Sequence, residues 1–211
     1  MKILLVSDVE HEAFYTPQVR SLCEDVELVI SCGDLPAPYL EYILTMLDVP
    51  LLYVPGNHDR PRETGEGRWI SGPEGGISVD GRVVDVKLPG RATVRVAGLG
   101  GSMFYGGTSN QYTERQMRRR AARLARRLMR DRVLRRRSLD ILVTHAPPLG
   151  IHDGKDRCHT GFGAFLRLIR RYRPRWLVHG HVHPSYGYDT EDRLIGGTAV
   201  LSVYGRRFLE I

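Results

Sequence analysis

The chain has 211 residues and a formal net charge of +7 at neutral pH. That length suits one sizeable α/β domain, and without a Pro-, Ser- or Gly-rich linker we expect a single domain over residues 1–211. The longest apolar runs are too short for a membrane-spanning helix, and no leader-like segment opens the chain. Its three cysteines include no CxxC pair and are interpreted as ordinary buried or half-buried thiols, so we expect a cytoplasmic protein.

Strand-like and helix-like segments alternate through the first half of the chain. The pattern predicts strands at residues 3–6, 28–31 and 51–54, and helices near residues 16–23 and 38–47. Such alternation favours a parallel sheet. Glycines at residues 72–76 then interrupt the pattern.

The second half predicts a further sheet. Short strands at residues 77–79, 82–87 and 93–97, separated by turn signals, favour a more antiparallel arrangement. A basic helix at about residues 112–137 precedes a strand at 141–143, a helix near 163–171 and a strand at 177–178. The end of the chain, residues 185–211, is interpreted as closing hairpins. We therefore predict an α/β fold of the αββα sandwich type, with two mixed sheets flanked by helices.

Five short polar blocks follow apolar runs. They are Asp8, Gly33-Asp34, Gly56-Asn57-His58-Asp59, Thr144-His145 and Gly180-His181-Val182-His183. Their carboxylate, amide and imidazole groups are donors that hard-to-borderline divalent metals favour. Because loops at the carboxyl ends of strands in an open sheet converge on one crevice, the blocks together predict a metal centre.

The order and spacing of these blocks resemble the calcineurin-like metallophosphoesterases, whose pattern runs D-x-H, G-D, G-N-H-D/E, H and G-H-x-H. Residues 144–150, with His152 and Asp153, are similar to the smaller phosphodiesterase branch of that superfamily. The resemblance implies hydrolysis of a small phosphodiester by hydroxide that two divalent ions activate. Manganese, iron and zinc are all compatible with such nitrogen and oxygen donors.

The resemblance also implies a role for each block. Asp34 would bridge the two ions, because a carboxylate has two oxygens that can each bind a metal. The implied remaining ligands are Asp8 and His183 for metal one, and Asn57, His145 and His181 for metal two. His58 would lie near the leaving-group oxygen and donate a proton there. No Asp lies three or four residues beyond the G-D pair to orient His58, and Asp59 is the remaining candidate for that task.

Glu10 occupies the position where the family pattern has a histidine. Three interpretations compete: Glu10 binds metal one, His11 reaches it through a one-residue bulge, or metal one has one protein ligand fewer. Side chains alternate along an extended segment, so Asp8 and Glu10 would share a face, which disfavours His11. With one protein ligand fewer at metal one, hydrolysis of unstrained substrates would be slowed most. We therefore expect phosphodiesterase activity to exceed monoesterase activity, with 2′,3′-cyclic nucleotides preferred over 3′,5′-cyclic ones.

Residues 114–137 contain twelve arginines against two acidic residues. An apolar stripe at helical spacing predicts an amphipathic helix docked on the body of the protein. Its members are Met117, Ala121, Leu124 and Leu128 and, less regularly, Val133 and Leu134. We favour a solvated or subunit-contacting outer face, which would allow a homo-oligomer, over binding of nucleic acid or another polyanion.

The remaining candidates are weaker. Tyr105 and Asn110, beside a Gly-rich stretch at residues 98–102, could contact a substrate phosphate. His152 and His159 could line the substrate pocket, although exposed loop positions are favoured for both, and His179 is interpreted as structural. Two other functions compete with a phosphodiesterase: a non-catalytic metal-binding or protein-binding scaffold, and a nuclease that uses the basic helix.

Overall fold

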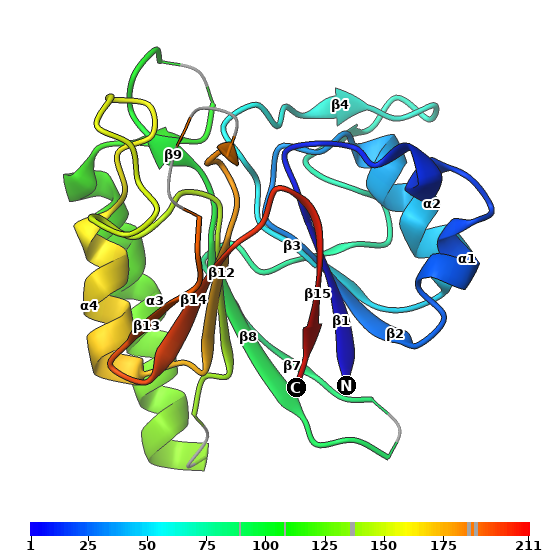
Figure 1. The fold of residues 1–211 in the computed structure, drawn as a ribbon. Coiled ribbons are helices and arrows are strands. Elements are labelled where there is room, and N and C mark those ends of the chain that lie inside the picture. Colours follow the sequence, from blue (N-terminus) through cyan, green and yellow to red (C-terminus); the bar gives the residue numbers. More distant parts are fainter. Residues whose placement is uncertain (89, 108, 136–137, 185–186, 188–189) are drawn as a thin grey trace.

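The protein is described by a computed structural model that covers residues 1–88, 90–107, 109–135, 138–184, 187 and 190–211. Two β-sheets lie face to face in the middle of the molecule, and helices cover the outer face of each sheet (Figure 1). The predicted sandwich of two mixed sheets is therefore confirmed. Among the described helices, none is both long and apolar enough to cross a membrane.

The first sheet has the strand order β15-β1-β2-β3-β6. Its strands are β1 (Lys2–Ser7), β2 (Val26–Ser31), β3 (Leu51–Tyr53), β6 (Ile77–Ser78) and β15 (Gly205–Glu210). All pairs are parallel except β15, which runs antiparallel to β1. Alternation along β1 directs Leu4 and Val6 toward the helices and Ile3 and Leu5 toward the other sheet. A 3₁₀ turn (Glu12–Tyr15), α1 (Val19–Leu22) and α2 (Ala37–Leu47) cover the outer face (Figure 1).

The second sheet has the strand order β13-β14-β12-β11-β8-β7. Its strands are β7 (Val83–Val86), β8 (Val94–Leu99), β11 (Ile141–Thr144), β12 (Trp176–His179), β13 (Arg193–Ile195) and β14 (Thr198–Ser202). The four central strands are parallel, and β7 and β13 add antiparallel edges. Helices α3 (Glu114–Arg135) and α4 (Gly163–Tyr172) cover its outer face (Figure 1).

Two short ribbons complete the described strands. The first pairs β4 (Arg62–Glu63) with β5 (Trp69–Ile70), and the second pairs β9 (Ser102–Met103) with β10 (Gln111–Tyr112). The sequence predicted neither, because two-residue strands carry no measurable alternation.

Three predictions about the fold were wrong in part. The second sheet has more antiparallel pairs than the first, as predicted, but its four central strands are parallel, and residues 77–78, predicted for this sheet, pair with β3 in the first sheet. The end of the chain forms one hairpin, β13–β14, and β15 then crosses to cover the free edge of β1. Residues 16–23 contain only the single turn α1, because the 3₁₀ turn and Pro17 occupy much of that connection.

The basic helix docks by its predicted stripe, since Met117, Ala121, Leu124 and Leu128 are all buried. Val133 is an exception with 72% of its surface exposed, and the side chain of Leu134 lies outside the described part of the chain. Some arginines contact the protein rather than water. Arg120 donates to both carboxylate oxygens of Asp80 at 2.6 Å, and its guanidinium lies 4.1 Å from the ring centroid of Tyr112.

Candidate metal centre

The polar blocks predicted as metal ligands meet at one edge of the sandwich, where the parallel strands of both sheets end. β1 leads to Asp8, β2 to Asp34, β11 to His145 and β12 to His181. The loop after β3 adds Asn57. Direct contacts form two groups, Asp34, Asn57 and His145 in one and Asp8, His181 and His183 in the other, and the rings of His145 and His181 join them.

The backbone turns sharply at three of these positions. Asp8, Asp34 and His181 have φ angles of 65°, 57° and 69°, in the left-handed region that side chains other than glycine seldom adopt. Such strained residues concentrate at functional sites, where the surrounding structure maintains them. Here the turn lies just after a strand and leaves a carboxylate or imidazole at the meeting point of the two sheets.

The residues predicted for metal two form the tightest group. His145 Nε2 lies 3.2 Å from Asp34 Oδ2 and 2.9 Å from Asn57 Oδ1, and the rings of His145 and His181 are 4.8 Å apart between centroids. Ligand atoms about 2.1 Å from an ion and at right angles to one another lie roughly 3.0 Å apart. The side chains of Asp34, Asn57 and His145 therefore fit around a divalent ion with little movement, and their oxygen and nitrogen donors suit such an ion.

The residues predicted for metal one are more open. His183 Nε2 lies 3.7 Å from Asp8 Oδ1, and the carboxylate of Asp8 accepts the backbone N–H of His181 at 2.9 Å and 3.1 Å. A cavity of about 400 Å³ reaches this point, and Asp8, Asp34 and His183 line it. Two residues of the metal-two group, Asp34 and His181, line the same cavity, and Asp34 is the carboxylate of the two, as a bridging ligand would be.

Comparison with known proteins agrees with this geometry. Residues 1–185 match the sequence profile of the calcineurin-like phosphoesterases (Metallophos). The chain belongs to this family. Family membership supports metal-dependent phosphoester hydrolysis.

The relatives with curated names match only a segment of this chain. Human metallophosphoesterase domain-containing protein 1 is 44% identical over 52 residues, which are 23% of this chain and 16% of that protein, and the mouse protein gives the same figures. The match therefore covers less than a fifth of either relative's length.

Solved structures share the fold over nearly the whole chain. TT1561 of Thermus thermophilus superposes on 97% of this chain and 89% of its own, with a TM-score of 0.58 and 17% identity. GAP50, described as the anchor in the inner membrane complex of Plasmodium, covers 97% and 71%, with a TM-score of 0.56 and 13% identity. Likeness at this level of identity shows the fold alone.

Glu10, the departure from the family pattern, does not line the metal cavity and its side chain is exposed. The extended alternation that placed it beside Asp8 ends at Asp8 itself, whose φ is positive. His11 packs its ring on Phe14, 5.1 Å between centroids, and its backbone N–H donates to the Tyr39 hydroxyl. Of the three interpretations, the structure favours a metal one with one protein ligand fewer.

Asp34 and His145 form an ion pair in this group of residues. Burial alone would raise the pKa of Asp34, but the charge and hydrogen bond of His145 outweigh it and lower that pKa to about 2. Burial would lower the pKa of His145, but Asp34 and then Asp8 raise it to about 9. Because a metal binds neutral imidazole, an ion at this position must displace a proton from His145.

His181 and Asp8 already have the protonation states that binding of a metal would require. Burial, and then the charge of His145, lower the pKa of His181 to about 4, so its imidazole is neutral. Burial opposes ionisation of Asp8, but the hydrogen bond from His183 and the charge of His145 outweigh it, and its pKa lies below the usual value. Asp8 is therefore a carboxylate at neutral pH.

His58, the predicted proton donor, is exposed at the rim of the cavity. Its backbone N–H donates to Asp34 Oδ1 at 2.8 Å, while no hydrogen bond to its ring occurs in the described part of the chain. Asp59, the suggested orienting partner, instead accepts the backbone N–H groups of Gly56 and Asp34. That suggestion was wrong, because the Asp59 carboxylate is used to hold two metal-site loops together.

Tyr105 and Asn110, predicted to contact phosphate, contact the metal-site loop. The Tyr105 hydroxyl accepts from Asn57 Nδ2 at 3.0 Å, so the amide oxygen of Asn57 faces His145. Asn110 Nδ2 donates to the carbonyl oxygens of Gly56 and Asp59. Both residues therefore position the loop that carries Asn57.

The Gly-rich stretch before Tyr105 serves packing. A Cβ atom on Gly100 would lie 2.3 Å from the Pro55 carbonyl oxygen. Glycine is thus required for the close approach of two loops, and the suggested contact with a ligand has no support here.

His152, proposed as a substrate residue at an exposed position, is buried. Its Nδ1 lies 2.8 Å from Nε2 of His179, and its Nε2 lies 2.6 Å from the carbonyl oxygen of Glu191. The prediction of exposure was therefore wrong. His152 also lines neither the metal cavity nor a second cavity beside it that Asp34 and His58 line. Burial lowers the pKa of His179 to about 3, so the His179 ring is neutral where it contacts His152.

Two residues beside the site carried no strong sequence signal. Cys158 and His159 both line the metal cavity, and the Cys158 carbonyl oxygen lies 2.9 Å from His181 Nε2. Burial raises the pKa of the Cys158 thiol, so the thiol is protonated without a metal. The adjacent Cys-His pair in a loop was the available signal, but a single pair is too common to predict a site.

Proposed function

We propose that this chain is a dinuclear metal-dependent phosphodiesterase. The observation that carries the proposal is the convergence of six oxygen and nitrogen donors at one edge of the sandwich. These are Asp8, Asp34, Asn57, His145, His181 and His183. A cavity of about 400 Å³, with His58 at its rim, gives a phosphate access to them.

The protein's own groups have separate tasks in this reaction. Divalent ions, when bound, would supply Lewis acidity and an acidified water. Asp34 presents both of its oxygens to the centre, one fixed by the His58 backbone and one beside His145. Asn57 contributes a neutral oxygen, which limits the negative charge that an incoming phosphate meets. His58, exposed at the rim, would protonate the leaving oxygen.

A second cavity supports an ester with an organic leaving group. It has a volume of about 540 Å³, and Asp34 and His58 line it as well as the metal cavity. Leu35, Pro36 and Tyr53 give it apolar walls. A leaving group protonated by His58 would lie in this side cavity, where such walls suit a base or another flat apolar group.

The preferred substrates would be 2′,3′-cyclic nucleotides. Their strained five-membered phosphate ring opens more readily than a relaxed 3′,5′-cyclic or linear ester. The exposure of Glu10 supports this preference, because a metal one with fewer protein ligands stabilises the transition state less.

The test of hydrolysis compares a chromogenic phosphodiester with the matching phosphomonoester in the presence of manganese, nickel or zinc. Asp34→Ala and His145→Ala should both abolish turnover and lower bound metal. Asp25→Ala, a change at an exposed carboxylate, is the matched control and should retain both. Turnover retained in Asp34→Ala and His145→Ala would refute the proposed enzyme.

The substrate preference has its own test. Rates on 2′,3′-cyclic and 3′,5′-cyclic adenosine monophosphate are compared at equal concentration. Faster cleavage of the 2′,3′ isomer supports the preference. Equal rates on the two isomers, or faster hydrolysis of simple monoesters, would refute the preference while leaving the metal centre in place.

A further inference from the structure

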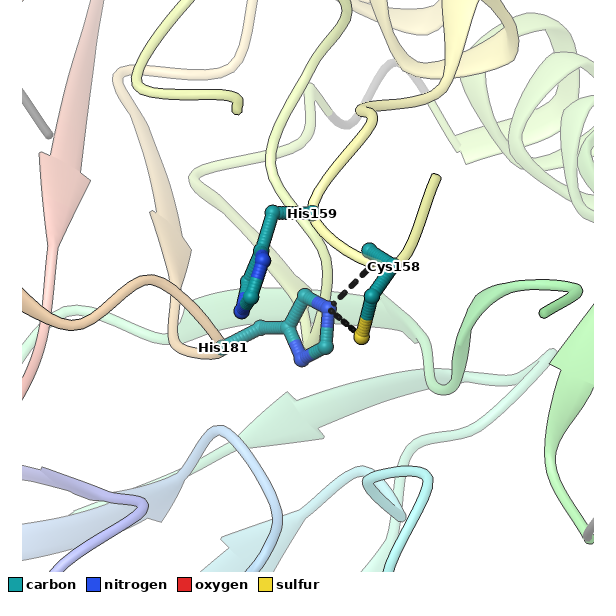
Figure 2. A group of neighbouring side chains, drawn as sticks. All are labelled: Cys158, His159 and His181. Carbon is teal, nitrogen blue, oxygen red and sulfur yellow. Dashed lines mark hydrogen bonds between the residues drawn. The ribbon is translucent and has the colours of Figure 1, made fainter. Parts of the chain in front are cut away.

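A group of three potential metal ligands borders the same cavity as Asp8 and Asp34. Cys158, His159 and His181 each offer one ligand atom, and these atoms all lie within 4.8 Å of one another. Figure 2 shows the Cys158 and His159 side chains extending from one loop toward the His181 ring. A thiol and two imidazoles form a softer donor set than the carboxylates and amide of the dinuclear centre.

The spacing of this group suits a tetrahedral ion. With bonds of about 2.3 Å to sulfur and about 2.1 Å to nitrogen, the two ligand atoms lie roughly 3.6 Å apart. The observed distance from Cys158 Sγ to His181 Nε2 is 4.0 Å. A shift of a few tenths of an ångström, together with release of the contact between His181 Nε2 and the Cys158 carbonyl, would bring both atoms into range.

Asp156 holds the loop in the arrangement that such a site needs. Its Oδ1 accepts the backbone N–H groups of Cys158 and His159 at 2.9 Å and 3.0 Å. Its carboxylate also contacts His159 Nδ1 at 2.8 Å and 3.0 Å. A carboxylate on one imidazole nitrogen fixes the tautomer and presents the other nitrogen as the ligand, as in many zinc sites.

We propose that Cys158, His159 and His181 form a second binding site, for a thiophilic divalent ion such as zinc, which shares His181 with the dinuclear centre. The three residues would supply three ligands, with water in the fourth position. The thiol of Cys158 would lose its proton to solvent as the sulfur–metal bond forms, so binding releases one proton at this residue.

Occupancy of this site would compete with metal two of the dinuclear centre. His181 Nε2 faces Cys158, while the other ring nitrogen points away from it (Figure 2). A neutral imidazole has one nitrogen that carries a proton and one that accepts a bond. An ion on Nε2 therefore leaves the proton on Nδ1, and His181 cannot then bind metal two. Zinc at this site would inhibit the enzyme.

Cobalt binding tests the site without reference to activity. Adding Co²⁺ to the metal-free wild-type protein should produce a near-ultraviolet thiolate-to-cobalt charge-transfer band. Cys158→Ser should lose the band, and Cys23→Ser, a change at a buried thiol remote from the cavity, should keep it. Asp156→Asn should weaken cobalt binding by about 10–100-fold. No band in the wild type, or a band that persists in Cys158→Ser, would overturn the site.

The competition is tested separately and rests on the proposed phosphodiesterase activity. Zinc is added to the manganese-loaded enzyme, and the zinc concentration that halves hydrolysis is measured. Cys158→Ser should need at least about tenfold more zinc than the wild type. Equal sensitivity would overturn the inhibitory role. Because the cobalt band does not depend on hydrolysis, an inactive wild-type protein would refute the activity and still allow the site to be judged.

Discussion

Gly180→Ala should displace Asp8 and thereby damage both the fold and metal one. Gly180 directly follows β12 and packs against Ser7 and Asp8 at the end of β1. An ideal Cβ atom at Gly180 would lie 1.9 Å from Ser7 Oγ and 2.5 Å from Asp8 Oδ2, whereas real Cβ atoms essentially never approach closer than 3.0 Å. The hydroxyl of Ser7 can rotate away. The carboxylate of Asp8 cannot, because the backbone N–H of His181 holds both of its oxygens.

The expected cost combines two effects. Forcing an extra carbon into a closely packed site costs about 1–3 kcal/mol. Loss of the hydrogen bond to Asp8 adds about 1 kcal/mol. The variant should therefore be about 2–4 kcal/mol less stable, which for a chain of this size corresponds to a fall in Tm of roughly 4–16 °C.

Denaturant unfolding of the metal-free protein measures this cost, and metal analysis shows whether metal one is lost. Gly65→Ala is the matched control, since no atom lies within 4 Å of its Cβ position and its φ is not positive. That control should stay within about 0.5 kcal/mol of the wild type. If Gly180→Ala also stays within that range and binds the same amount of metal, the close approach of β1 and β12 does not position Asp8.

Three further outcomes are expected. Tyr105→Phe removes the hydroxyl that orients Asn57. The loss of about 0.5–1.5 kcal/mol should lower the metal affinity measured by calorimetry about 2- to 13-fold, and an unchanged affinity would contradict this role. In the metal-free protein, His145 contributes stability that is complete below pH 6.5 and lost as pH rises through about 9, while Asp34 contributes stability present above pH 3.8 and lost as pH falls through about 2. The Tm of the metal-free protein should therefore fall as the pH drops toward about 2 and as it rises toward about 9. Metal affinity should rise between pH 6.5 and 9 as His145 loses its proton, and a Tm and a metal affinity that do not change with pH would argue against the ion pair. Leu124→Ala should destabilise the protein to denaturant by about 2–5 kcal/mol, because Leu124 is fully buried under the basic helix, and a loss below about 1 kcal/mol would not fit that burial.

The sequence by itself determined the parallel strands and the polar residues that follow them. Apolar runs such as residues 3–6 and 141–143 form strands because their β-branched and aliphatic side chains fit a sheet buried on both faces. Asp8, Asp34 and His181 each follow such a strand within three residues. The shared direction of the strands brings these residues together, so local pattern and order were sufficient to place the predicted metal ligands near one another.

Only the tertiary structure decided what surrounds those ligands. Glu10 points to solvent because Asp8 leaves the extended conformation, and no periodicity predicts a single left-handed residue. His152 is buried against His179, 27 residues away in sequence, and Tyr105 reaches Asn57 across 48 residues. β15 likewise finds its partner at the other end of the chain. Such contacts depend on how distant segments pack, and the local sequence at either partner carries no record of the other.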